Sequence, residues 1–506
     1  MVIAGKTTHI APYWGCNHNI QSGLNQLGIR NISEQLFSIL LPGLNNVSLR
    51  IRYYSFYCWI ISKFYDGKDN ADTKEFYSFI RKSELLLALI NSLYEDSTGI
   101  PGINFASVWI QSDSQSFSLT DGTDLSSGEK TYWSNYGGIF RQYYVASLEE
   151  MGLIGSNENA SQLYNITKNT NFISGQVLAE EFDKSVGPKG SFFTETVYRG
   201  WVTRDELDEL KQDFHMKFMT VSNSEKEKLI QMLLQSDTPD SPDPSFHRRA
   251  TIKYLLAYLL NRRTSLKPLD FSAYMYENYT SNSENITAWG WYAYYLNDNW
   301  QYQLTRIFSD ILRCLNNSPG LWTDISDITD SIVTEVAASL NMDDSIPLAS
   351  AIERLRYDNT ESESATAICA LLAKYKENVG KLEESEMRYQ ELGLSAENFC
   401  SFIRLVQNSL DKSFKSFFKD LITDIIYRHY RVSFRKMLQT GIPTQKFAFE
   451  NGKLRFLDNW SSTHTSPRID TIRNFLYDTG IIKGTPTYDE LTDRGLYLLK
   501  ELEHEN

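Results

Sequence analysis

Residues 427 to 446 include basic and aromatic side chains and no acid, a composition suited to phosphate binding. The basic residues are Arg428, Arg431, Arg435, Lys436 and Lys446. On a helix the three arginines share one face, and rings repeat with the same spacing one residue earlier, at Tyr427, Tyr430 and Phe434. Guanidinium groups beside rings hold phosphates and stack bases, so we predict a nucleic-acid-binding face. In the alternative interpretation, the rings form a core stripe and the arginines pair with the acid-rich residues 324–364.

A second acid-free stretch, from residue 246 to residue 267, is another candidate basic patch. Its basic residues are Arg248, Arg249, Lys253, Arg262, Arg263 and Lys267, with His247 beside them. The middle of the stretch, residues 254–260, is apolar, which predicts a helix buried at its centre and charged at its ends. Arginines near a helix C-terminus also stabilise the helix dipole, and this role is the alternative to nucleic-acid binding.

The sequence predicts no catalytic residue, metal ligand or cofactor. Gly5-Lys6-Thr7-Thr8 lacks the earlier glycine and the strand of a phosphate-binding loop. The seven histidines form no i, i+4 pair, and Cys16 with His18 lacks a second ligand pair for zinc. Acidic runs remain possible elements of a metal-dependent nuclease, at Glu180-Glu181-Asp183, Asp205-Glu206-Asp208-Glu209 and Asp343-Asp344. Such runs are more typical of solvated helix faces.

The composition indicates a folded protein on which any basic surface must be local. Of its 506 residues 42% are apolar and 13% aromatic, enough for a large core. A net charge of −13 argues against a phosphate-binding surface over the whole molecule. The five cysteines are scattered, which fits a reducing cytosol. We find neither a signal peptide nor an apolar run near the roughly 20 residues of a membrane span, so we expect a cytoplasmic protein.

Helices are expected to position the candidate residues. Asp72, Thr203 and Ser224 each stand three residues before a Glu, the pattern of a capping box. Apolar residues recur with helical period over long stretches, at 46–95, 202–236, 246–263, 286–315, 324–340, 363–390 and 395–439. Two ring-rich segments, 49–59 and 289–295, are predicted to be core. In the segment 446–456, Asn451-Gly452 predicts a β-hairpin, because both turn positions favour positive φ.

The last forty residues are typical of a winged helix. An amphipathic helix ends at Gly480, two isoleucines and a polar turn follow, and Thr492 opens another helix. The first of these helices contributes two further candidate nucleic-acid-binding residues, Arg468 and Arg473. A looser copy passes through Gly152 and Thr167, where the spacing from threonine to the next glycine is eight residues instead of three. The alternative for both copies is a helix–hairpin–helix packed into a larger body, without a binding role.

These observations predict a mainly α, multi-lobed protein with one or two winged-helix modules and a C-terminal β-hairpin. The proline-rich residues 238–245 separate an N-terminal lobe (1–237, with the looser winged helix at about 138–184) from a central lobe (246–439), and residues 440–506 follow. The predicted function is a non-enzymatic, DNA-associated scaffold that binds duplex DNA and partner protein subunits. One alternative is a pure protein–protein docking subunit. The other is a metal-dependent nuclease or effector of a prokaryotic antiviral defence system.

Overall fold

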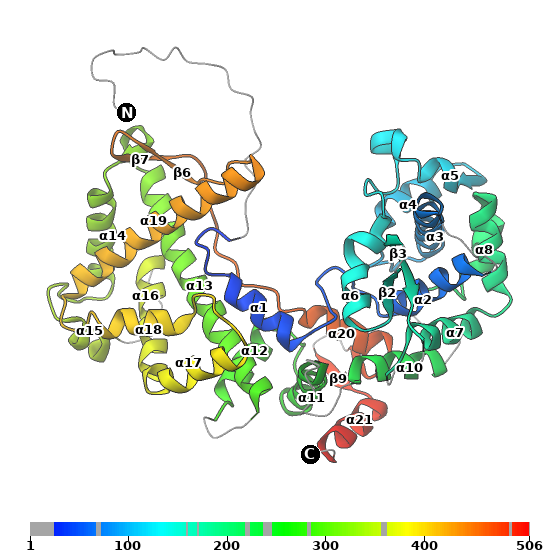
Figure 1. The fold of residues 1–506 in the computed structure, drawn as a ribbon. Helices are drawn as coiled ribbons and strands as arrows, with labels where there is room; N and C mark the ends of the chain where they lie inside the picture. Colours follow the sequence, from blue (N-terminus) through cyan, green and yellow to red (C-terminus); the bar gives the residue numbers. More distant parts are fainter. Residues whose placement is uncertain are drawn as a thin grey trace, which may run out of the picture. The chain divides into compact units, whose positions relative to one another are not determined.

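The computed structural model is mainly helical, with 65% of residues in helices and 8% in strands, and its sheets are small and antiparallel. The predicted fold class is confirmed at this level. The structure describes residues 25–66, 72–157, 160–168, 172–217, 223–235, 245–280, 285–355, 362–484 and 488–504. Of the proposed linker 238–245, only Ser245 lies within these ranges. The chain forms two compact units (Figure 1): unit 1 comprises residues 1–33 and 296–465, and unit 2 comprises residues 34–295 and 466–506.

Where the structure describes it, unit 1 is a helical body with one small sheet. Its helices are the C-terminal part of α13 (Ile286–Asn316), α14 (Ile325–Ser339), α15 (Leu348–Arg354), α16 (Glu363–Asn378), α17 (Leu382–Glu391), α18 (Phe399–Gln407) and α19 (Phe414–Thr440). Its strands are β5 (Trp322–Thr323), β6 (Phe447–Glu450) and β7 (Lys453–Phe456). Helix α14 packs against both α16 and α19. The buried side chains of these helices are mostly aliphatic and aromatic, so this unit has a core of its own.

The predicted β-hairpin of unit 1 is confirmed. Strands β6 and β7 pair antiparallel, with Phe447 opposite Phe456. Asn451 and Gly452 form the turn with φ of 52° and 80°, the conformation that the sequence predicted. Strand β5 pairs with the other side of β7, so the sheet order is β5–β7–β6 and β6 is an edge strand.

The described residues of unit 2 form the remaining helices and three two-stranded sheets. Its first part holds most of α1 (Asn31–Leu40), then α2 (Arg52–Tyr65), α3 (Thr73–Asn91), α4 (Ile103–Ile110), β1 (Ser116–Ser118), α5 (Leu119–Gly122), a π-helical turn (Phe140–Tyr144), α6 (Val145–Glu150), β2 (Ile154–Asn157), β3 (Ala160–Ile166) and α7 (Gly175–Val186). Then follow α8 (Lys189–Arg199), β4 (Trp201–Thr203), α9 (Arg204–Leu210), α10 (Asn223–Leu234), α11 (Ser245–Arg262), α12 (Pro268–Glu277), α20 (Ile469–Asp478), β8 (Ile482–Gly484), β9 (Asp489–Leu491) and α21 (Asp493–His504). Strand β1 pairs with β4.

The ring-rich helix α2 is buried in unit 2, as predicted. Every residue from 52 to 61 is buried, and α2 packs mainly against α7. Its rings meet rings of other elements, for example Tyr57 with Tyr144 at 4.8 Å between centroids. The other predicted core segment is also buried from Trp289 to Tyr294. Aromatic surface on all sides of a helix therefore indicated burial correctly here.

Two of the three predicted helix starts are confirmed. The Asp72 carboxylate accepts a hydrogen bond from the Glu75 backbone N–H at 3.0 Å. Thr203 and Glu206 form the full reciprocal capping box at the start of α9. Ser224 is not an N-cap, because α10 already includes Asn223. At Asp72 and Thr203, the residue three positions before a glutamate therefore marks the start of the helix.

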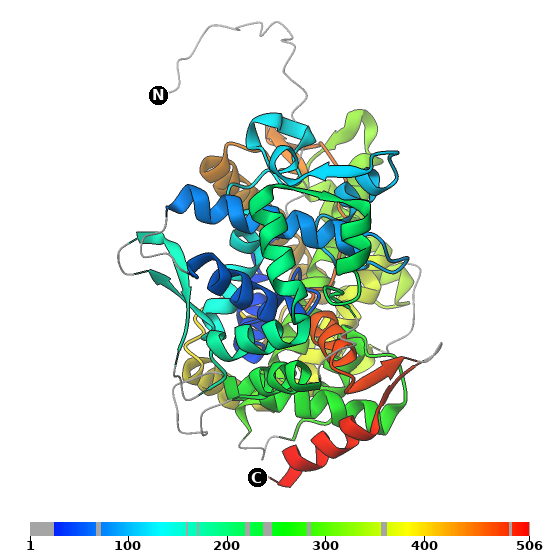
Figure 2. The same cartoon turned by 90° about the vertical axis from the view of Figure 1, so that its right-hand side faces the viewer.

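A helix–hairpin–helix segment occurs twice in unit 2, at the two places where the sequence suggested a winged helix. In the first segment, α6 is followed by the hairpin β2–β3 and by α7. In the second, α20 is followed by β8–β9 and by α21, drawn in red in Figure 2. The strand registers correspond, since Ile154 lies opposite Ile166 and Ile482 lies opposite Leu491.

The two segments share the same set of contacts. The corresponding residues are Gly152, Thr167 and Gly175 in the first segment, and Gly480, Thr492 and Gly495 in the second. Each threonine hydroxyl donates to the carbonyl of the first glycine, at 2.7 Å in both segments. Each also accepts from the N–H of the last glycine, at 3.0 and 3.2 Å. The first glycines have φ of 69° and 73°. The two segments are therefore structural repeats, despite the difference in threonine–glycine spacing.

Candidate interaction surface on helix α19

Helix α19, which carries all the predicted phosphate-binding residues of the 427–446 segment except Lys446, has a buried face and an exposed apolar face. Ser413 caps its start by accepting from the Ser416 N–H at 3.2 Å, and Gly441 ends it with φ of 71°. The buried side chains are Phe414, Phe417, Phe418, Leu421, Ile422, Ile425, Ile426, His429 and Ser433. Because both faces of α19 carry apolar residues, the helical periodicity of the sequence did not show which face packs into the core.

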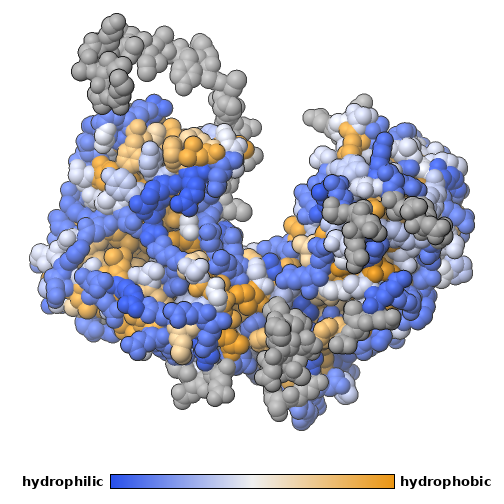
Figure 3. Space-filling model, viewed as in Figure 1, coloured by the Kyte–Doolittle hydropathy of each residue, from blue (hydrophilic) through white to orange (hydrophobic). Residues whose placement is uncertain are grey.

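The second apolar face of α19 is exposed, and we call its residues Tyr427, Tyr430, Phe434 and Leu438 the α19 stripe. Their exposed fractions are 43%, 37%, 42% and 70%. Phe449 of strand β6 extends the stripe, with its ring 4.8 Å from that of Tyr430. Figure 3 shows apolar surface at the end of unit 1 that carries β6 and β7. The alternative interpretation of these rings as a core stripe is therefore wrong.

The three arginines beside the α19 stripe differ in their surroundings. Arg428 forms two hydrogen bonds of 2.7 Å with Glu397 and a further ion pair with Asp424. These carboxylates, Glu397 first, raise the pKa of the Arg428 guanidinium above its usual value. Arg431 is 62% exposed and lies 3.7 Å from Asp424. Arg435 is exposed and forms no ion pair with any residue that the structure describes.

The two lysines of the predicted phosphate-binding group are engaged within unit 1. Lys436 donates to the backbone carbonyl of Asn25 at 2.6 Å. The Lys446 side chain is only 1% exposed and forms an ion pair with Asp458. The Lys446 backbone N–H donates to Nε2 of His429 at 2.9 Å, and burial lowers the pKa of that histidine to about 3. The nitrogens that would contact phosphate are thus already used inside the fold.

The two arginines of the C-terminal segment are engaged within unit 2. Arg468 donates to the carbonyl of Leu41 at 2.9 Å and to the hydroxyl of Ser38 at 3.1 Å. Burial lowers the pKa of Arg468 below its usual value. Arg473 forms a bidentate pair with Asp489, at 2.7 and 2.9 Å. Between Ile469 and Asp478 only Asp470 is exposed, so α20 presents little surface to a ligand.

Most of the second basic patch also has structural contacts. Arg248 is 1% exposed and donates to the carbonyls of Leu233 and Pro42, at 2.8 and 2.7 Å. Arg249 donates to the carbonyl of Leu234 at 3.0 Å, and Arg262 lies 3.5 Å from Glu277. Of the remaining basic residues, Lys253 is half-buried, while Arg263 and Lys267 are exposed. The expected burial of the middle of this helix is confirmed by its leucines at 255, 256 and 259.

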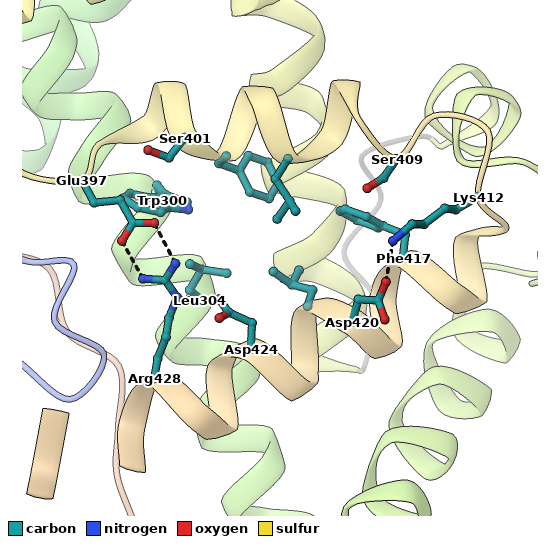
Figure 4. A pocket seen from close by; sticks show the side chains of 13 residues that line it. Trp300, Leu304, Glu397, Ser401, Ser409, Lys412, Phe417, Asp420, Asp424 and Arg428 are labelled. Carbon is teal, nitrogen blue, oxygen red and sulfur yellow. Dashed lines mark hydrogen bonds and ion pairs between the residues drawn. The ribbon is translucent and has the colours of Figure 1, made fainter. Parts of the chain in front are cut away.

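A pocket of about 360 Å³ lies between α13, α18 and α19 (Figure 4). Its apolar lining consists of Trp300, Leu304, Phe402, Leu405, Phe417 and Leu421. Two ion pairs stand at its ends, Arg428 with Glu397 and Lys412 with Asp420. The sequence gave no sign of this pocket, because its residues come from three separate helices and from the loops on either side of α18.

The acidic runs do not converge on a metal site in the part of the chain that the structure describes. No three His, Cys, Asp or Glu side chains there are placed to hold a metal ion. Glu181 pairs with Lys184, and Glu206 belongs to the capping box of α9. Asp344 pairs with Lys415. Cys16 and His18 lie outside the described residues.

Unit 2 also holds buried acids that the sequence did not reveal. Asp478 is buried and forms an ion pair of 2.9 Å with Arg50, while Glu225 forms one of 3.2 Å with Arg52. Burial raises the pKa of Asp478 to about 7. The partners in these pairs are separated by 428 and 173 residues, so nothing local in the sequence marks them.

Comparison with protein families, curated proteins and solved structures yields no match. Within the described residues, no helix is long and apolar enough to cross a membrane. Functional inference therefore rests on the surfaces of this chain alone.

Proposed function

We propose that this protein is a non-enzymatic docking subunit that binds a partner protein through the α19 stripe. The observation that carries the proposal is the row of four apolar side chains, all more than one third exposed, on one face of a single helix. From residue 427 to residue 438 the stripe extends about 16 Å along the helix axis, at 1.5 Å per residue. A contiguous exposed apolar patch with a polar border is typical of protein interaction sites.

A protein partner is favoured over duplex DNA by what the basic residues already contact. Binding to DNA depends mainly on cationic groups that are available to phosphates. Arg428, Lys446 and Arg473 have carboxylate partners, and Arg468 is held by a backbone carbonyl. Leu438, the most exposed member of the stripe, offers neither a charge nor a ring to nucleic acid.

The border of the stripe indicates the chemistry of the partner. Arg431 and Arg435 are exposed beside the rings: Arg431 has one carboxylate within reach, Asp424 at 3.7 Å, and Arg435 has none among the described residues. A segment with apolar side chains on one side and Asp or Glu at its edges would pair with both features. Such charge complementarity mainly sets specificity and association rate, while the buried rings supply most of the affinity.

The repeated helix–hairpin–helix segments are consistent with winged-helix-like modules that have a structural role. Arg473 is paired with Asp489 of the adjoining hairpin, and Arg494 of α21 contacts Glu227 of α10. The Arg494–Glu227 contact and the Asp478–Arg50 ion pair connect the C-terminal segment to the rest of unit 2. We therefore infer that the modules build the body, whereas the α19 stripe recruits the partner.

The test is photo-cross-linking of the full chain in cells of its own source, with p-benzoylphenylalanine in place of Phe434. The matched control carries it in place of Met387, an exposed apolar residue of α17 outside the stripe. We expect position 434 to link to a protein segment that contains both acids and apolar residues. Adding the double change Arg431→Glu and Arg435→Glu should reduce this product about tenfold, because both border charges are reversed.

Three results would contradict the proposal. The first is equal cross-linking at positions 434 and 387. The second is a protein product that the double charge reversal leaves unchanged. The third is a product at position 434 that is mainly nucleic acid, which would restore the DNA-associated scaffold as the leading hypothesis.

A further inference from the structure

The pocket between α13, α18 and α19 has the size and lining of a small-molecule site. Its volume of about 360 Å³ falls in the range of roughly 300 to 1,000 Å³ that is typical of ligand pockets. The walls are formed by rings and leucines, among them Trp300, Phe402 and Leu421, which are all buried. An apolar ligand between such walls is removed from water, and no charged side chain has to move to accommodate it.

The indole N–H of Trp300 is the polar group that a ligand would use. Trp300 is only 2% exposed, and its Nε1 has no acceptor among the residues that the structure describes. In Figure 4 this nitrogen lies on the side of the indole that faces the space between α18 and α19. A buried donor without an acceptor is unfavourable, so a ligand oxygen placed there would gain a full hydrogen bond.

The charged groups at the ends of the pocket disfavour an anionic ligand. The lining holds three acids, Glu397, Asp420 and Asp424, against two bases, Lys412 and Arg428. Both bases are already paired with these acids. A carboxylate or phosphate would have to break one of these pairs, whereas an uncharged molecule leaves them intact.

We infer that this pocket binds an uncharged, mainly apolar small molecule whose acceptor oxygen takes the hydrogen bond of the Trp300 indole. The inference is independent of the docking proposal, because the pocket is lined by other side chains than those of the α19 stripe. In this proposal Trp300 binds the ligand, and the two ion pairs close the ends of the pocket.

The test uses benzophenone as the probe, since its carbonyl is an acceptor and ultraviolet light attaches it to nearby C–H bonds. Peptide mass spectrometry of the full chain should place saturable labelling on the segments 297–308 and 399–428. Acetophenone and ethylbenzene, two competitors of similar size, differ in the acceptor carbonyl. We expect acetophenone to compete five to ten times better, the value of one hydrogen bond.

Two variants distinguish binding in the proposed pocket from nonspecific binding elsewhere on the protein. Trp300→Phe keeps an aromatic ring but removes the N–H, and the two competitors should then become equal within twofold. Ser401→Trp places a bulky ring at an exposed rim position and should abolish the labelling without touching the core. Trp322→Phe, outside the pocket, is the matched control that should change nothing.

The inference is overturned by unsaturable or scattered labelling of the wild-type chain, which would mean that the pocket holds only water. It is also overturned if acetophenone and ethylbenzene compete equally in the wild type, because the indole N–H then plays no part. Labelling that persists in Ser401→Trp would place the bound probe elsewhere. If Trp300→Phe fails to fold, two other measurements still test the inference. These are the labelling of Ser401→Trp and the ratio of competition by acetophenone and ethylbenzene in the wild type.

Discussion

Replacing Glu84 with Gln should remove a pH dependence from the stability of unit 2. Glu84 of α3 is 2% exposed, and its carboxylate accepts from the backbone N–H groups of Ile139 and Phe140, at 3.0 and 2.7 Å. The Tyr57 hydroxyl donates to it at 3.0 Å. Burial outweighs these hydrogen bonds and raises the pKa of Glu84 from 4.5 to about 7. That difference corresponds to roughly 3 kcal/mol.

The direction of the effect follows from proton binding. Below about pH 4.5 Glu84 is protonated in the folded and the unfolded chain, so it brings no pH-dependent penalty. Between pH 4.5 and pH 7 the folded chain binds more protons than the unfolded chain, so stability falls as the pH rises. Above pH 7 the folded chain carries the whole penalty of about 3 kcal/mol for a buried carboxylate.

Glu84→Gln removes the titrating carboxyl group, but the variant also loses one hydrogen bond. One amide nitrogen must face a backbone N–H, so we expect the variant to be less stable than the wild type by about 1 to 2 kcal/mol at pH 5. By pH 8 the difference should move in favour of the variant by roughly 3 kcal/mol. Asp478, whose pKa is also about 7, affects both proteins equally and cancels in this comparison.

The assay is urea unfolding at pH 5 and pH 8, read by hydrogen-exchange mass spectrometry on peptides of α3. This readout follows unit 2 by itself, which matters because a chain of two units need not unfold in one step. Glu75→Gln, at an exposed position of the same helix, is the control for the loss of a carboxylate from α3. If Glu84→Gln gave the same difference at both pH values within about 0.5 kcal/mol, the burial argument would be refuted.

Two further predictions concern the repeated segments. Gly495→Ala should cost roughly 1 to 3 kcal/mol, because the new Cβ would lie 2.3 Å from the Ile481 carbonyl oxygen. Gly155→Ala, where no atom lies within 4 Å, is the control, and equal thermal midpoints for the two variants would contradict the repeat geometry. Asp478→Ala should cost about 1 to 3 kcal/mol, because it leaves one N–H group of the buried Arg50 without its acceptor. Limited proteolysis should then cut near α20 first, and unchanged proteolysis would count against this ion pair as the anchor of α20.

The sequence predicted those elements whose causes are local. Asn451-Gly452 requires positive φ at two adjacent positions, and this requirement located the β6–β7 hairpin. The glycine and threonine of each helix–hairpin–helix segment act through hydrogen bonds within the segment, so both copies could be found. The sequence did not reveal which arginines were available to a ligand. That depends on partners such as Glu397, which lies 31 residues from Arg428 along the chain.

An exposed arginine without a carboxylate partner is unexpected on this chain, because acidic residues outnumber basic residues. With 63 acidic and 50 basic residues, a base on the surface has many carboxylates that could pair with it within the fold. Arg428 follows this expectation. Arg435 has no such partner among the described residues, and it stands beside four apolar side chains that the core does not cover. Both features have one common explanation in an acidic, apolar partner, whereas a purely structural role for the C-terminal half of α19 explains neither.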